Sequence, residues 1–274
     1  MSNLSLGETV LCMWKDDKIA AYSIGGDDCL RSQLFFAMPE MERRGIYGTW
    51  WVNPGRAGPV NYKDHDDEWA ECWIACYDQW KAADTRGHDF ANHTMHHQGA
   101  ATYEEAEQEI RQTAEIIWQT NPRQRLQLFL RGGNPTWEVN PDLARLKGYV
   151  DTAIAEGSWH LVGFHGIGPD CEWGGPVDGA VFTGMLDYLF EKRNLVWTGT
   201  HTEVHKYDQE RSTASVSLLE VTPNGLRLNL SSEKEPRLYD YPLTLRTKVD
   251  PGWERVLVSQ GGVTHSIPVN AGMV

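Results

Sequence analysis

The chain has 274 residues, 41% of them hydrophobic and 23% charged, which is an ordinary composition for a soluble globular protein with a sizeable core. A formal net charge of −13 without a basic stripe argues against nucleic acids and anionic membranes as partners. No run of 18 apolar residues and no signal-peptide pattern is present. We therefore expect no membrane span and a cytoplasmic location, unless an export signal has been removed.

The first predicted elements form a strand, a helix and a strand. Lys18–Ile24 is a short apolar run that ends in Gly-Gly-Asp-Asp, which predicts a strand delivering two aspartates to a turn. A helix that stops at Gly45 follows, and the aromatic stretch IYGTWWVNPG (46–55) predicts the next strand. This order is the βαβ unit of a parallel sheet.

The same alternation continues to about residue 200. A helix ends at Gly87, and HDFANHT (88–94) predicts a short strand. The clearest helix begins at Thr102, which forms a capping-box pattern with Glu105, and stops before Pro122. Further strands and helices are predicted in turn at QRLQLFLRGG (124–133), NPDLARLKGYVDTAIAEG (140–157), WHLVGFHGIG (159–168), AVFTGMLDYLFEKRN (180–194) and LVWTGT (195–200). The series predicts an α/β fold, a (β/α) barrel that is whole or distorted.

The pattern changes after Arg211. Apolar and polar residues alternate around turn signals such as Pro223-Asn224-Gly225, which predicts an all-β segment. We expect a barrel domain over residues 1–211 and a small C-terminal β region over residues 212–274 that packs on it.

Ionisable residues follow four of the predicted strands. They are, in chain order, Asp27 and Asp28, His93 and His97, Arg131, and His165. Because the carboxyl ends of parallel barrel strands open on one face, where active sites are built, we expect these side chains to share a rim.

Two of these histidines have the spacing of a ligand pair. His93 and His97 are four residues apart, which brings both rings to one face if the turn is helical. Two neutral imidazoles, one carboxylate and solvent make an open catalytic zinc site, in which one of the paired aspartates would be the third ligand and the other the general base. The neighbouring His88 and His96 are expected to be solvated surface imidazoles.

Other candidate pairs are weaker. Cys72 and Cys76 could form a redox pair or half of a zinc site, but no second cysteine pair follows, so buried core thiols are the better expectation. His201 and His205 are also four apart, and no carboxylate motif accompanies them.

The order of these segments resembles a known family. AYSIGGDD followed by ANHTMHH is similar to the first two motifs of the polysaccharide deacetylases, the NodB-homology group known as carbohydrate esterase family 4. Those motifs are T-F-D-D-G and H-[ST]-x-x-H, and HTMHH fits the second without a mismatch. LFLRGGNPTW resembles the arginine motif, LVGFHGIG the strand ending in the catalytic histidine, and LVWTGTHTEVHKY the last barrel strand with its helix. The resemblance covers roughly residues 18–211 and implies the distorted (β/α) barrel of this family.

The resemblance also implies a set of site residues. Asp28, His93 and His97 would bind one divalent metal, most simply zinc, although cobalt, nickel or iron also suits this ligand set. Asp27 would be the general base, Arg131 would orient it, and His165 would be the general acid. Trp137 and Trp173 follow two of the motifs, where their rings could meet a sugar.

The chain departs from the family pattern in three places. Gly25-Gly26 precedes the aspartate pair in place of Thr-Phe, and Cys29 follows it in place of glycine. Gln98 replaces the usual proline, and the arginine motif reads R-G-G-N-P-T-W rather than R-x-P-Y-G. The chain is thus similar to a divergent member of the family.

The resulting functional hypothesis is a metal-dependent hydrolase that removes acetyl groups from an N- or O-acetylated carbohydrate. A metal-bound water would be the nucleophile, with an aspartate general base and a histidine general acid. Two alternatives stay open: an amide or imide hydrolase of the same superfamily that acts on a small molecule, and a glycan-binding protein whose catalysis has lapsed.

Overall fold

The computed structural model describes residues 5–56, 77–83, 86–122, 124–128, 135–168 and 174–274. Contacts divide the chain into two compact units. One is Ile19–His205, and the other combines Met1–Lys18 with Lys206–Val274. The N-terminal segment thus belongs with the C-terminal strands, whereas the predicted domains divide the chain once, at residues 211 and 212. That boundary stays a prediction.

The larger unit is built on a parallel sheet. Its strands are β2 (Ala20–Asp27), β3 (Thr49–Val52), β4 (Asp89–Asn92), β5 (Thr136–Glu138), β6 (Trp159–Phe164) and β7 (Val196–Thr198). The order is β4-β3-β2-β6-β5, with β7 beside the first residues of β2, and every pair is parallel. The expected α/β class is confirmed. Among the described residues β4 and β5 are not paired with each other, so closure into a barrel stays a prediction.

The helices lie where the periodicity places them, with one strand shifted. The capping box of Thr102 and Glu105 is present and opens a continuous helical stretch of α4 (Tyr103–Ala106), a π-helical turn (Glu107–Arg111) and α5 (Gln112–Thr120). The larger unit also contains a π-helical turn (Gln33–Ala37), α1 (Met38–Glu42), α3 (Tyr77–Lys81), α6 (Leu143–Glu156) and α7 (Gly179–Glu191). Residues 124–128 of the expected strand have no regular structure, and the short β5 follows instead.

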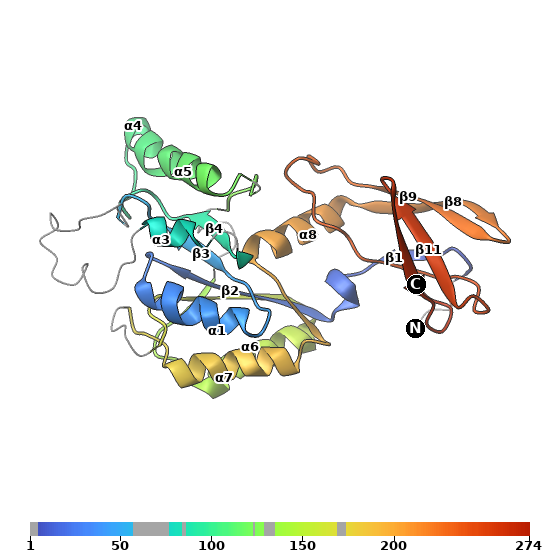
Figure 1. Cartoon of the computed structure of the whole chain (residues 1–274), viewed down its shortest axis with the longest axis horizontal. Helices are drawn as coiled ribbons and strands as arrows, with labels where there is room; N and C mark the ends of the chain where they lie inside the picture. Colours follow the sequence, from blue (N-terminus) through green and yellow to red (C-terminus); the bar gives the residue numbers. More distant parts are fainter. Residues whose placement is uncertain (1–4, 57–76, 84–85, 123, 129–134, 169–173) are drawn as a thin grey trace, which may run out of the picture. The chain divides into compact units, whose positions relative to one another are not determined.

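The sheet buries different side chains on its two faces. On one face Tyr22 and Ile24 join the main core, over which α6 and α7 pack side by side (Figure 1). On the other, Trp51, Ala91 and Leu161 form a separate aromatic cluster with partly buried Trp137 and Trp159. Successive residues of a strand point to opposite faces, so the run of apolar strand residues serves two cores.

Gly25 makes room for the tryptophan cluster. A Cβ atom at this position would lie 2.2 Å from the Trp51 ring and 2.6 Å from the backbone oxygen of Thr49. We expect Gly25→Ala to lower the free energy of unfolding by about 3 kcal/mol, because neither a buried indole nor a strand backbone can give way cheaply. Urea unfolding measures this, with Gly148→Ala in α6 as the control, since a Cβ there meets open space. Equal stabilities of the two variants would contradict the tight packing.

The smaller unit is made of antiparallel strand pairs. They are β1 (Thr9–Leu11) with β10 (Leu245–Thr247), β8 (Ser215–Thr222) with β9 (Gly225–Ser231), and β11 (Arg255–Gln260) with β12 (Val263–Pro268). The β character expected of the C-terminal region is confirmed. The helix α8 (His201–Thr213) begins in the larger unit and ends in this one.

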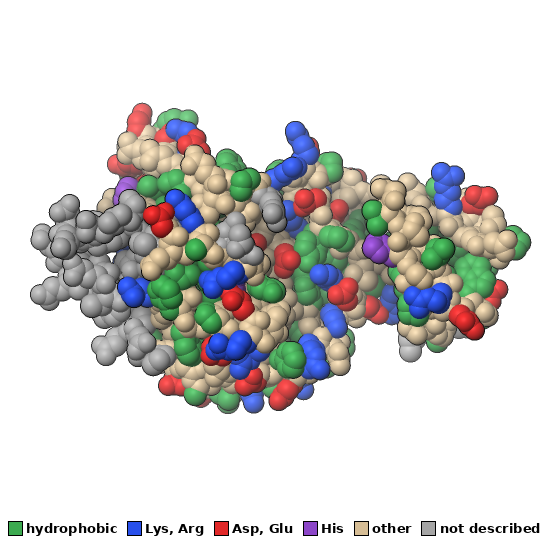
Figure 2. All heavy atoms as spheres, viewed as in Figure 1, with side chains coloured by type: hydrophobic (Ala, Val, Ile, Leu, Met, Phe, Trp, Pro, Cys, Tyr) green, Lys and Arg blue, Asp and Glu red, His purple; other side chains and the backbone are tan. Residues whose placement is uncertain are grey.

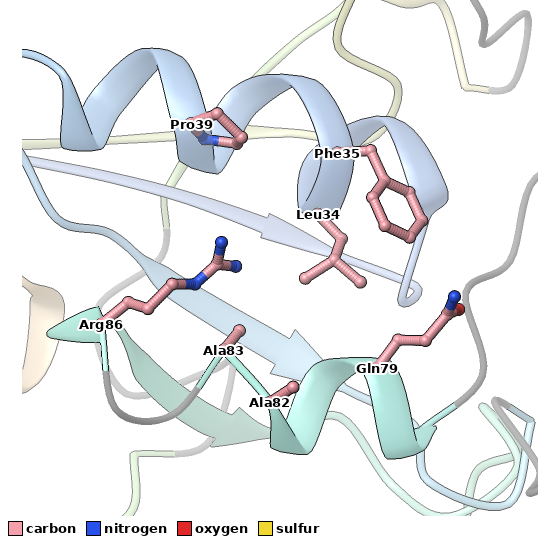
Figure 3. A pocket seen from close by; sticks show the side chains of 7 residues that line it. All are labelled: Leu34, Phe35, Pro39, Gln79, Ala82, Ala83 and Arg86. Atoms are coloured by element: carbon pink, nitrogen blue, oxygen red, sulfur yellow. The ribbon is translucent and has the colours of Figure 1, made fainter.

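The surface carries mixed charges and a groove beside α1. Figure 2 shows Lys and Arg side chains interspersed with acidic ones over each unit. A groove beside α1 is lined by Leu34, Phe35 and Pro39 on one side and by Gln79, Ala82 and Arg86 on the other (Figure 3). None of the described helices combines the length and apolar character needed to cross a bilayer.

His88 is a core residue, which corrects the expectation of a solvated imidazole. It is 2% exposed, and its Nδ1 accepts hydrogen bonds from the backbone N–H of Gly48 (3.0 Å) and from Nε1 of Trp50 (3.1 Å). Its position at the start of a strand hides it beneath α1. Burial lowers the pKa of His88 to about 3.

This lowered pKa predicts a pH dependence of stability. Between the unfolded pKa of about 6.5 and the folded pKa of about 3, the unfolded state binds the extra proton, so stability falls as the pH falls. We expect the His88 contribution to be complete above pH 6.5 and to have dropped by about 2.5 kcal/mol at pH 4.5. Asparagine can supply the same acceptor without titrating. The stability difference between the wild type and His88→Asn should therefore shift with pH, and a difference that is constant from pH 7.5 to 4.5 would refute the idea.

Candidate active site

Three strand ends bring the candidate residues together. Asp27 ends β2 and Asp28 follows it, His93 follows β4, and His165 follows β6. Parallel pairing of the strands sets these positions at one edge of the sheet. The aspartates are almost fully buried, at 4% and 2% exposure. Two ionisable carboxyl groups with so little access to water require nearby partners.

The turn after β2 has an unusual backbone. Asp28 and Cys29 both lie in the left-handed region, with φ of 68° and 56°. This is the region that favours glycine, the residue that the family motif has where this chain has Cys29. Its Sγ accepts a hydrogen bond from the backbone N–H of Asn53 at 3.2 Å, a contact that glycine could not make. The cysteine thus ties the aspartate turn to the segment after β3.

The two candidate ligand histidines are brought together by a loop. The segment between them is not helical: residues 95–97 form bends, and Thr94 and His97 have φ of 68° and 59°. The rings of His93 and His97 nevertheless lie 4.6 Å apart between centroids. Asn53 holds the loop by donating from its side-chain amide to the carbonyl oxygens of His93 and Thr94. Hydrogen bonds from Asn53, rather than a helical turn, therefore shape the loop that brings the two rings together.

His96 is an anchor of this loop, although half of its side chain is exposed. Its Nδ1 lies 2.7 Å from Oε1 of Glu109, and its backbone N–H donates to Oε2 of the same carboxylate at 2.9 Å. Glu109 is itself 7% exposed and belongs to the π-helical turn. His96 is thus at the surface, as expected, but its ring is paired with a carboxylate. One carboxylate clamps the loop between the two candidate ligands.

Loss of this clamp should weaken metal binding without touching a candidate ligand. We expect Glu109→Ala to reduce zinc affinity by about tenfold, the effect typical of removing a group that orients a ligand. Titration calorimetry of the chelator-treated protein measures it, and Glu107→Ala, on the exposed side of the same turn, is the control. Unchanged affinity for zinc would show that the loop holds its shape without Glu109.

Asp28, His93 and His97 form a group whose potential ligand atoms all lie within 4.8 Å of one another. Nε2 of His97 and Nε2 of His93 face the same oxygen, Oδ1 of Asp28, at 3.6 and 3.7 Å. Nε2 of His93 is buried and has no hydrogen-bond partner among the described residues. Burial lowers the pKa of His93 to about 4, so its ring is neutral at pH 7. Two neutral imidazoles and a buried carboxylate are a donor set that suits a divalent metal.

Asp27 and His165 form the second part of the site. Oδ1 of Asp27 lies 3.5 Å from Nε2 of His165 and has no hydrogen-bond partner among the described residues. Burial, together with the charge of Asp28, raises the pKa of Asp27 well above that of an ordinary carboxyl group. Burial also lowers the pKa of His165. The two shifts bring an acid and a base closer in proton affinity, as proton transfer between them requires.

Of the other predicted site residues, the structure describes Trp137. The ring of Trp137 lies 4.9 Å from that of His165, at an angle of 34°. Trp137 thus lies beside the site. Arg131 and Trp173 lie outside the described residues, as do Cys72 and Cys76.

The sequence reasoning missed Arg56. Its Nη1 forms an ion pair with Oδ1 of Asp28 at 3.2 Å. Arg56 comes four residues after Val52, the last residue of β3, and so occupies a strand end like the other site residues. Its position just after a predicted strand is the signal in the sequence that points to Arg56.

The whole arrangement is a candidate metal centre beside a buried carboxyl group and an imidazole, at the carboxyl edge of a parallel sheet. No protein-family model matches the chain. A stretch of 93 residues, 32% of the chain, is 29% identical to a gellan lyase from a Bacillus species. That match spans 4% of the length of the lyase.

Among solved structures, the chain is similar to family 4 carbohydrate esterases, the family that its motifs resemble. The Xyl-CE4 domain of a multidomain xylanase from the hindgut metagenome of Trinervitermes trinervoides matches with a TM-score of 0.44 and 14% identity, over 68% of this chain and 90% of that one. A family 4 acetyl xylan esterase from Clostridium thermocellum, in complex with cobalt, matches with 0.42 and 13%, over 67% and 89%. The peptidoglycan deacetylase PdaC of Bacillus subtilis matches with 0.39 and 12%, over 68% and 90%.

Proposed function

We propose that this protein is a metal-dependent deacetylase that removes acetyl groups from an N- or O-acetylated carbohydrate. The observation that carries the proposal is the convergence of two carboxylates and three imidazoles from three strand ends, in the order of the family motifs. Charged and ionisable groups are rarely buried together unless they bind a metal or do chemistry.

In the proposed site Asp28, His93 and His97 hold the metal. A bound divalent ion supplies a Lewis acid that activates water and polarises the acetyl carbonyl group. His93 is suited to this role because its ring is neutral and its buried Nε2 faces Asp28. The metal is zinc by ligand type, with cobalt, nickel and iron as the other candidates.

Asp27 acts as the general base. Its raised pKa makes its carboxylate a stronger proton acceptor than an exposed aspartate, and it lies next to the candidate ligand Asp28. His165 delivers the proton to the departing amine or alkoxide. The 3.5 Å between Oδ1 of Asp27 and Nε2 of His165 supports passage of that proton from base to acid. One proton therefore leaves water and ends on the leaving group.

Trp137 contributes a flat apolar surface beside His165, which is suited to packing against a sugar ring or an acetyl methyl group. Arg131 would orient the base and Trp173 would contact substrate, and both roles stay predictions. A negative net charge leaves neutral or cationic glycans free of long-range repulsion.

Acetate release tests the proposal. The purified chain, loaded with zinc, is offered acetylated chitin oligomers, peptidoglycan and acetylated xylan, and free acetate is measured. We expect release from at least one of them, loss of release after treatment with a chelator, and recovery when zinc is added back. Zinc-dependent hydrolysis of a small amide or imide with none from the glycans would favour the small-molecule hydrolase. Glycan binding without any acetate would favour the lapsed enzyme.

A further inference from the structure

The guanidinium of Arg56 lies against the oxygen that the two candidate ligand histidines face. Nη1 of Arg56 is 3.2 Å from Oδ1 of Asp28, and Nε2 of His93 and Nε2 of His97 are 3.7 and 3.6 Å from the same oxygen. The Asp28 side chain is 2% exposed. Three nitrogen-bearing side chains from two loops thus converge on one buried carboxylate oxygen.

The position of Arg56 is fixed by the histidine loop itself. Its backbone N–H donates to the carbonyl oxygen of Met95 at 3.1 Å, and the N–H of Gly55 donates to the same oxygen at 2.9 Å. Asn53, in the same segment, donates to His93 and Thr94. The backbone of Arg56 is therefore held beside the histidine loop, while its side chain can turn. The Arg56 side chain is 21% exposed, so solvent is within its reach.

We infer that Arg56 and the divalent metal compete for Oδ1 of Asp28, so that Arg56 sets the metal affinity of the site. This inference rests on the metal site of the proposed function. Without metal, Arg56 supplies the positive charge that the buried aspartate requires. A divalent ion held by Asp28, His93 and His97 would lie within a few ångströms of the guanidinium, and the two cations repel each other.

The atom that Arg56 contacts distinguishes competition from support. A group that supports a ligand carboxylate does so best from the oxygen that does not face the other ligands, where it orients the carboxylate without approaching the metal. Arg56 instead contacts Oδ1, the oxygen turned towards both histidines. A metal bound at Oδ1 would then share this oxygen with the guanidinium, at a distance at which two cations repel each other.

Zinc titration of the full chain tests the competition. Chelator-treated wild type and Arg56→Gln are titrated calorimetrically with zinc, and the melting temperature of each is measured with and without zinc. Arg44→Gln is the matched control, because Arg44 is 18% exposed and pairs with Glu40 and Asp187, neither of which is a candidate site residue.

We expect Arg56→Gln to bind zinc about tenfold more tightly than wild type, since one repelling charge is gone. It should melt at a lower temperature than wild type without zinc and at the same temperature with zinc. Arg44→Gln should leave zinc affinity unchanged. Weaker or equal zinc binding by Arg56→Gln, or an equal loss of melting temperature in both states, would overturn the inference.

The two proposals can fail separately. Zinc binding that Arg56→Gln strengthens, without acetate release from any substrate, would overturn the deacetylase and support the competition. Zinc-dependent acetate release, together with an unchanged zinc affinity in Arg56→Gln, would support the deacetylase and overturn the competition.

Discussion

Asp27→Asn should abolish most acetate release while the protein stays folded and keeps its metal. We expect a loss of about a thousandfold, because the amide cannot accept the proton that the buried carboxylate takes. The substitution changes the shape of the side chain little, and it removes one of two neighbouring buried carboxylates. Stability should therefore not fall. The measurements are the rate of acetate release, zinc content and the thermal unfolding temperature.

Asp28→Asn is the matched comparison, since it makes the same change one residue further on. We expect that variant to lose zinc as well as activity, because its carboxylate oxygen faces both histidines. Acetate release that persists in Asp27→Asn would mean that another group is the base. Equal zinc loss in both variants would mean that the two aspartates share the metal, as the second cluster of Asp27, Asp28 and His165 allows.

His97→Gln should reduce zinc affinity by more than the roughly 10- to 100-fold that loss of an orienting group costs. The side chain of His97 is 48% exposed, so its replacement should leave the fold unchanged. His93→Gln should have the same effect on zinc and should also destabilise the protein, because that side chain is only 10% exposed. Zinc titration and urea unfolding separate the two effects.

His265→Gln controls for the loss of an imidazole, since His265 is exposed in β12. Its zinc affinity and acetate release should match those of wild type. If His97→Gln kept the zinc affinity of wild type, the metal would have to be held by other residues.

Much of the larger unit follows from local sequence patterns. The capping box of Thr102 and Glu105 and the apolar run before Asp27 each specify a short segment, and the structure confirms the helix and the strand there. Parallel strands then bring their carboxyl ends to one edge without further information. The proximity of Asp27, His93 and His165 could therefore be predicted from topology alone.

What could not be predicted depends on long-range hydrogen bonds. The loop of His93 and His97 gains its shape from Asn53 and Glu109, which lie 13 to 41 residues from the residues they bind, and no periodicity encodes such partners. The same holds for His88, whose burial depends on a strand start beneath a helix. A histidine-rich stretch is hydrophilic in composition, and composition alone places its members on the surface.

The pairing of the N-terminal segment also could not be predicted from local sequence patterns. β1 pairs with β10, more than 230 residues later, and both are strands of three residues. So short a strand carries little alternation of apolar and polar residues. The association of residues 1–18 with the C-terminal strands was accordingly missing from the expected domain boundaries.

We expect Asp28, His93 and His97 to hold the metal on which acetate release depends. Anomalous diffraction from crystals of the zinc-loaded chain, recorded on both sides of the zinc edge, tests it most directly. We predict one strong zinc peak per chain, in contact with Oδ1 of Asp28 and with Nε2 of both histidines, and with Arg56 turned away. A peak bound by Asp27, Asp28 and His165 instead, or no peak in this cluster at saturating zinc, would contradict the account.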